Sequence, residues 1–271
     1  MRTGINWTED ETILAFQLYL TTPFGKISEN YPPIIELSKL LGRTPSAVAL
    51  KMQNLAANDP QQISRGIKAM QHGSKIDSLL WTKYADRWDE LEKKAEDIRD
   101  QLGLYESLNS TSSENQNYIQ EHQGAYREYL AKVRINQPVF RSYVLAAYNE
   151  TCCITGISYS RLLTACHIKP WSESTAQEKT DPHNGLAMNS FHHLAYDEGL
   201  FIIDPDEYRI HLSNSAKKAI IKDTVLKGWL GQYDNNQIKL PNRFSPNKDY
   251  LQYHNDHLSA AQKDSFSVVI Y

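Results

Sequence analysis

The sequence has little cysteine: only Cys152, Cys153 and Cys166 occur in 271 residues. Adjacent cysteines rarely bridge each other, so these three residues cannot build a disulfide framework. No Cys-x-x-Cys pair is present, which excludes the zinc knuckles that brace some small domains.

Long apolar runs are also missing. No stretch approaches the ~18 uninterrupted apolar residues that a membrane-spanning helix requires, so we expect no membrane partner. The opening residues, MRTGINWTEDE, turn acidic at once and contain no apolar segment typical of a signal peptide. The expected location is therefore the cytoplasm.

An excess of positive charge is missing as well. The 29 basic and 32 acidic residues give a formal net charge of −3, which argues against indiscriminate binding of nucleic acid. A local basic face is still allowed, because phosphate contacts depend on where the charge lies.

The chain is long enough for two modest domains. The polar stretch 108–117, LNSTSSENQN, has no periodic apolar pattern and predicts a linker. Upstream of it the patterns are helical, and downstream they mix short β-type runs with turns and helices. We therefore expect an α+β protein with a helical domain over 1–107 and a mixed domain over 118–271.

Three helices are predicted near the N-terminus. Thr8 and Glu11 fit a capping box, and apolar residues then recur at helical spacing to about Tyr19. A second helix follows Pro32 and ends at Gly42. Thr44-Pro45 begins a third, with Val48, Met52 and Leu55 on one face.

Two helices joined by a short turn that contains glycine are typical of a helix-turn-helix. With the opening WTEDE and the RTPSAV that begins the third helix, residues 7–57 resemble Myb/SANT-like DNA-binding domains. The resemblance implies a duplex-DNA partner read by the third helix. Five basic residues against one acid between residues 43 and 75 give a local charge of +4. The implied DNA contacts are Arg43, Ser46, Lys51, Gln53 and Asn54. The alternatives are a small helical bundle with a solvated Lys/Arg face and a protein-docking module.

Residues 79–102 predict one long amphipathic helix. Apolar residues recur from Leu80 to Ala95 at i, i+4 and i+8, and charges alternate on the opposite face. We expect this stripe to pack in the core, with a homodimer surface as the alternative.

The second half predicts a strand, a turn, a strand, a loop and a helix. A helix over Phe140–Tyr148 precedes an apolar β-type run at 152–156 and a second run at 162–168. A polar loop leads to Asn184-Gly185, and a helix is expected over 190–196. A further helix over 216–226 and an extended tail should follow.

Histidines stand at two informative places in this order. His167 ends the second run, and an imidazole suits a general base because its pKa lies near neutrality. His193 and Asp197 are one helical turn apart, so they can present a nitrogen and an oxygen to one cation. His192 is expected to be a surface histidine.

The order of these residues resembles the HNH, or ββα-metal, endonuclease family. The similarity is greatest to a restriction-type branch with a Q-x-x-F-R helix followed by C-x-T-G, A-x-H-I-x-P-W, N-G-L and H-H. The matching residues are Gln137, Phe140, Arg141, Cys153, Thr155, Gly156, Ala165, His167, Ile168, Pro170, Trp171, Asn184, Gly185, Leu186, His192 and His193.

The resemblance implies a role for each of several residues. His167 would be the general base, Asn184 would fix the loop against the strand that contains His167, and His193 and Asp197 would bind a divalent metal ion. Lys169 would contact phosphate. Cys166 stands where many HNH enzymes have a metal-binding Asp or His before the base. A thiolate suits Mg²⁺ poorly, so Mn²⁺ or Zn²⁺ are alternatives.

Together these patterns favour a metal-dependent nuclease that hydrolyses DNA phosphodiester bonds. The expected setting is bacterial restriction or defence, with an N-terminal DNA-recognition module. The alternative is a non-catalytic DNA-binding or regulatory protein on a degenerate nuclease fold, which Cys166 alone supports.

Overall fold

The computed structural model describes residues 5–66, 74–85, 87–102 and 137–258. The chain divides into two compact units, Met1–Ala146 and Ala147–Tyr271. The first is helical, and the second combines helices with small antiparallel sheets, so the expected mixture of helix and sheet is confirmed. The predicted linker at 108–117 lies outside the described residues, and the domain bounds stay a prediction.

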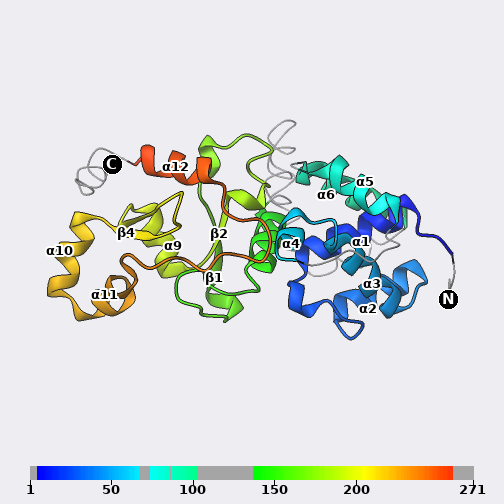
Figure 1. Ribbon diagram of the computed structural model, residues 1–271, viewed down its shortest axis with the longest axis horizontal. Helices are drawn as coiled ribbons and strands as arrows, with labels where there is room; N and C mark the ends of the chain where they lie inside the picture. Colours follow the sequence, from blue (N-terminus) through cyan, green and yellow to red (C-terminus); the bar gives the residue numbers. More distant parts are fainter. Residues whose placement is uncertain (1–4, 67–73, 86, 103–136, 259–271) are drawn as a thin grey trace, which may run out of the picture. The chain divides into compact units, whose positions relative to one another are not determined.

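The first three helices follow local sequence signals (Figure 1). Helix α1 spans Glu9–Thr21, and Thr8 and Glu11 form the predicted capping box. Helix α2 spans Pro32–Leu41 and ends at Gly42, whose φ of 63° is the left-handed conformation that glycine adopts most readily. Helix α3 spans Pro45–Ala56, with the Thr44 side chain accepting a hydrogen bond from Ala47 N–H.

The predicted long helix over 79–102 is wrong as a single element. The chain forms α5, Lys75–Tyr84, and α6, Trp88–Gln101, because the backbone turns to φ −53° and ψ 127° at Ala85. The residues of the predicted apolar stripe are nevertheless buried along its whole length, from Leu80 through Trp88 to Ala95. It packs inside this unit, where both helices contact α1, so it is no exposed dimer surface.

A row of aromatic side chains in contact links these helices to the helix over 137–147. This helix matches the prediction for Phe140–Tyr148 closely. Ring centroids lie 4.9 Å apart between Phe16 and Trp81, and 6.4 Å apart between Trp81 and Trp88. Trp88 is likewise 6.4 Å from Tyr143, whose hydroxyl donates to the buried Glu92. These rings therefore form a continuous line of contacts within a core whose other buried side chains are mostly aliphatic.

Two predicted DNA contacts lie inside this unit. Arg43 is 5% exposed and pairs with Glu11 at 2.6 Å, while Lys51 is 3% exposed and pairs with the buried Asp77 at 2.7 Å. Both cations also lie against the ring of Trp7. Burial and pairing remove both charges from the surface, so the predicted phosphate contacts of Arg43 and Lys51 are corrected to structural ion pairs.

Lys51→Met should therefore unfold the protein rather than weaken DNA binding. The variant leaves the carboxylate of Asp77 buried without its counter-charge, which typically costs about 3–5 kcal/mol in the free energy of unfolding. Denaturant unfolding measures this loss. The exposed Gln53→Ala on the same helix is the matched control and should change stability by less than about 0.5 kcal/mol. Lys51→Met with Asp77→Leu should recover most of the loss, and a fully stable Lys51→Met would contradict the assignment.

The second unit is centred on a ββα arrangement. Strand β1, Leu163–His167, pairs antiparallel with β2, Gly185–Asn189, and α9, Ser190–Asp197, follows β2 directly (Figure 1). The predicted strand at 152–156 is wrong: this segment is a turn in which Cys153 N–H donates to Ala187 O at 2.7 Å. The second strand is instead formed by the residues just after Asn184.

The remaining chain surrounds this arrangement. Strands β3, Phe201–Ile203, and β4, Ile210–Leu212, form a second antiparallel pair that the sequence did not predict. The predicted helix over 216–226 is two helices, α10, Asn214–Lys222, and α11, Thr224–Trp229, with Asp223 capping the second. The tail expected to be extended contains α12, Lys248–Asp256. The other short helices are α4 Pro60–Ser64, η1 Phe24–Lys26, η3 Ser160–Leu162, η4 Trp171–Glu173, η5 Pro182–Asn184 and η6 Gly231–Tyr233.

Among the described residues, no helix has both the length and the apolar character needed to cross a membrane.

Candidate functional site

The candidate site lies where β1 ends and α9 begins. The strand register places His167 opposite Gly185 and Cys166 opposite Leu186. The side chain of Asn189 caps α9 by accepting from His192 N–H. Because no loop separates β2 from α9, the side chains of α9 have a fixed position relative to the end of β1.

The ring of His167 contacts the backbone of the loop that follows it. Its Nε2 lies 3.1 Å from the carbonyl oxygen of Lys179, and a carbonyl can only accept, so Nε2 holds the hydrogen. Nδ1 then has the lone pair that can accept a proton. The ring also packs edge-on against Trp171, with centroids 5.5 Å apart.

Burial lowers the pKa of His167 to about 4, with a smaller lowering contribution from His193. The carbonyl of Lys179 and the carboxylate of Asp197 act in the opposite direction. The imidazole is therefore neutral at physiological pH, which is the protonation state that a general base requires.

His193 has the reverse arrangement. Its Nδ1 lies 3.0 Å from Thr164 Oγ1, whose own hydrogen is donated to Met188 O at 3.2 Å. Nδ1 must therefore donate to Thr164, and Nε2 has the lone pair. That nitrogen lies 3.3 Å from Oδ2 of Asp197, so lone pairs of both side chains are available at the same place.

Cys166 joins these two residues in a group that fits a metal ion. One ligand atom each from Cys166, His193 and Asp197 lies within 4.8 Å of the others. Cys166 is buried, His193 is half-buried and Asp197 is exposed, so a cation can reach the group from solvent. The sulfur, nitrogen and oxygen donors together suit a borderline or soft divalent ion. Burial, with Asp197 nearby, raises the pKa of the Cys166 thiol well above its usual range, so metal binding there must displace a proton.

Asn184 is fully buried and connects two segments of the site. Its Oδ1 accepts from Lys169 N–H at 2.7 Å, and its Nδ2 donates to Glu178 O at 3.1 Å and Lys169 O at 3.2 Å. The backbone of Asn184 also accepts from Ile168 N–H at 2.9 Å. This is the geometry that fixing the loop after His167 requires.

The other predicted contacts are not members of this ligand group. Lys169 pairs with Glu178 at 2.8 Å, so a phosphate at that ammonium would compete with a carboxylate. Ser46 and Gln53 are exposed and Asn54 is half-buried, all on α3 of the first unit.

Two features of the site were not predicted. His192 is fully buried rather than on the surface, because its ring lies 3.0 Å from Asn189 Oδ1 and 2.7 Å from Trp229 O. Thr164, the acceptor for His193, was missed. Alternation along a strand places Thr164 on the same face as Cys166, which is the signal that identifies it.

Asn184→Ala should have two effects: it should destabilise the protein and displace His167. It leaves Lys169 N–H and Glu178 O without their buried partner, which costs roughly 1–3 kcal/mol for each group left unpaired. Thermal unfolding measures the loss. Gln252→Ala, at an exposed hydrogen bond on α12, serves as the control and should be neutral. An Asn184→Ala variant as stable as the wild type would contradict the assigned role.

The comparisons with known proteins agree with the geometry of this segment. Residues 152–204 match the model of a family described as HNH endonuclease, HNH_2. The matched range includes β1, β2, α9 and the first strand of the second hairpin. No curated protein matches the chain. The match supports the HNH family, and an HNH endonuclease segment indicates nuclease activity on a nucleic-acid substrate.

Proposed function

We propose that this protein is a divalent-metal-dependent endonuclease that hydrolyses phosphodiester bonds of duplex DNA in bacterial restriction or defence. The observation behind the proposal is the position of a neutral histidine, His167, next to the ligand group of Cys166, His193 and Asp197. A base and a cation site at the end of one ββα arrangement are the two components that metal-assisted hydrolysis needs.

His167 would act as the base. Its Nδ1 accepts a proton from the attacking water, while the hydrogen bond from Nε2 to Lys179 O keeps the ring oriented. Asn184 keeps the following loop in place through Lys169 and Glu178. When bound at Cys166, His193 and Asp197, a divalent cation supplies charge stabilisation for the departing oxygen.

The first unit would read the DNA sequence. Helices α2 and α3 are joined by the short turn at Gly42, as in a helix-turn-helix. With Arg43 and Lys51 buried, the predicted contacts that reach the surface of α3 are Ser46, Gln53 and Asn54. Recognition there would depend on uncharged hydrogen-bonding groups. The affinity for DNA should therefore fall less steeply with salt than it would if Arg43 and Lys51 contacted phosphates.

His167→Ala should reduce cleavage of supercoiled plasmid by about 10²–10⁴-fold, the usual contribution of a positioned base. The wild type is assayed with Mg²⁺, Mn²⁺ or Zn²⁺ and again with excess EDTA, which should abolish cutting. His257→Ala, an exposed histidine on the same unit, is the matched control and should cut normally. Robust cutting in EDTA would exclude the metal mechanism. A wild type that binds DNA but cuts with none of these ions would favour the non-catalytic alternative.

Thr164→Val should weaken metal binding by roughly 10–100-fold, as found when the hydrogen-bond partner of a ligating histidine is removed. Valine is close to threonine in shape but cannot accept the hydrogen of His193 Nδ1, so the ring loses its fixed orientation. Calorimetric titration of Mn²⁺ and Zn²⁺ measures the effect. Thr164→Ser should restore affinity because it keeps the hydroxyl, and equal affinity of the valine and serine variants would contradict the role.

A further inference from the structure

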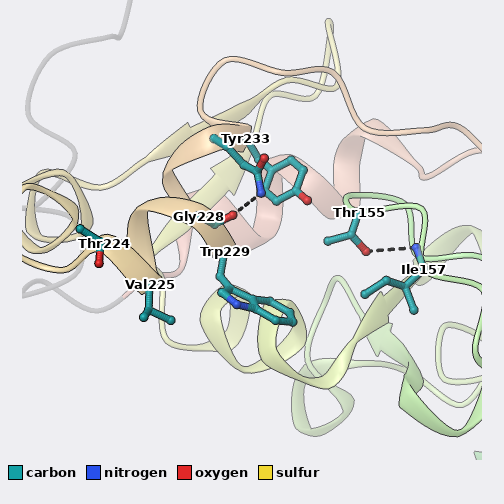
Figure 2. Close-up of a pocket in the computed structure, with 8 residues that line it drawn as sticks. Thr155, Ile157, Thr224, Val225, Gly228, Trp229 and Tyr233 are labelled. Atoms are coloured by element: carbon teal, nitrogen blue, oxygen red, sulfur yellow. Dashed lines mark hydrogen bonds between the residues drawn. The ribbon is translucent and has the colours of Figure 1, made fainter.

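The second unit has a pocket that the proposed chemistry does not use. Its volume is about 490 Å³, within the range of roughly 300–1,000 Å³ typical of small-ligand sites. Figure 2 shows α11 and the following turn on one side and the segment at 155–157 on the other. Residues that line the pocket include Thr155, Ile157, Val225, Trp229, Gln232 and Tyr233.

Trp229 is the largest side chain of this pocket and is 47% exposed. Its ring packs against Phe191, with centroids 5.7 Å apart, and its backbone oxygen accepts from the ring of His192 at 2.7 Å. Phe191 and His192 both belong to α9. Trp229 is thus an indole held in a defined place with much of its surface in solvent.

Polar groups accompany the aromatic surface. In Figure 2 the hydroxyl of Thr155 accepts from Ile157 N–H. The amide of Gln232 donates to Gly228 O. Hydroxyl and amide groups beside an indole and a phenol match the two demands of a nucleobase, which has a flat π-face and an edge of donors and acceptors.

Positive charge lies beside the pocket on a chain that is net negative. Four exposed lysines, Lys217, Lys218, Lys222 and Lys227, lie on α10 and α11. Asp223 lies between these helices and Asp234 pairs with Lys217 at 3.6 Å, so the local charge is +2. On the other side, Lys239 Nζ lies only 2.5 Å from where a Cβ on Gly156 would stand, so this ammonium is next to the wall at 155–157. This charge complements a phosphate backbone.

We infer that this pocket binds an unpaired nucleobase of the nucleic-acid substrate, stacked on Trp229, with the flanking phosphates near the lysines of α10 and α11. The inference rests on the proposed function for its substrate class. A base inside a duplex is already stacked on both faces, so it can reach Trp229 only from a single strand or after leaving the helix. The site therefore discriminates unpaired from paired nucleic acid.

The test uses the full-length chain with EDTA present, so that binding is separated from cutting. Fluorescence anisotropy measures the affinity of the protein for three labelled DNA probes. They are a single-stranded oligonucleotide, its duplex, and the duplex with one abasic site opposite a normal base. Trp229→Ala should weaken single-strand binding roughly tenfold, as expected for loss of one stacked base, and change duplex binding by less than about threefold. Trp229→Phe should restore most of the affinity because it keeps an aromatic face. Ile221→Ala, an exposed apolar residue of α10 outside the pocket, should bind as the wild type.

The two proposals fail separately in this design. Cutting by the wild type with unchanged single-strand binding in Trp229→Ala would overturn the inference and leave the nuclease function standing. If binding depends on Trp229 but the protein fails to cut with any of the metal ions tested, the inference is supported and the nuclease function is overturned. Light scattering completes the comparison: a wild-type dimer that Trp229→Ala dissociates, with single-strand affinity unchanged, would assign the pocket to contact between copies and overturn the inference.

Discussion

The pairing of β1 with β2 is the constraint on which the candidate site depends. Successive side chains of a strand point to opposite faces, so Cys166 is directed toward Asp197 of α9 while His167 reaches the carbonyl of Lys179. A slip of one residue would exchange the two faces and place the thiol where the base should be. Burial of every residue of β2 makes such a slip costly, because each side chain would have to repack among different buried neighbours.

The two histidines of the site would differ in function under the proposed mechanism because the protein fixes opposite nitrogens. The carbonyl of Lys179 holds the hydrogen of His167 on Nε2, whereas the hydroxyl of Thr164 holds that of His193 on Nδ1. Each ring then has its lone pair on the other nitrogen, one suited to accept a proton and one suited to bind a cation. The groups that fix the two hydrogens are a neutral carbonyl and a neutral hydroxyl, while Asp197 lies 3.3 Å from the other nitrogen of His193.

Local signals predicted most of the helical fold from the sequence, and non-local contacts explain the errors. The caps at Thr8 and Thr44 and the stop at Gly42 depend on adjacent residues alone, and all three are present. Burial of Arg43 and Lys51 depends on Glu11 and Asp77, which are 32 and 26 residues away. Likewise, the run at 152–156 and the strand at 185–189 are both short and apolar, and only pairing with β1 separates them. In the candidate site, the order of His167, Asn184 and His193 was visible, but Thr164 and the Lys179 carbonyl become partners only through folding.

The thiol of Cys166 determines which donors of the ligand group different cations would use. Burial raises its pKa, so without a metal it is a neutral wall of the site. Zn²⁺ forms strong bonds to sulfur and can displace the proton, which would give three protein ligands and leave a position for water. Mg²⁺ prefers oxygen and keeps several of its waters, so it would use Asp197, with His193 as a weaker ligand, and leave the thiol protonated. The same three side chains would thus hold a soft ion through all three donors and a hard ion mainly through the carboxylate. The response of metal affinity to pH distinguishes them, because only the first releases the proton of Cys166.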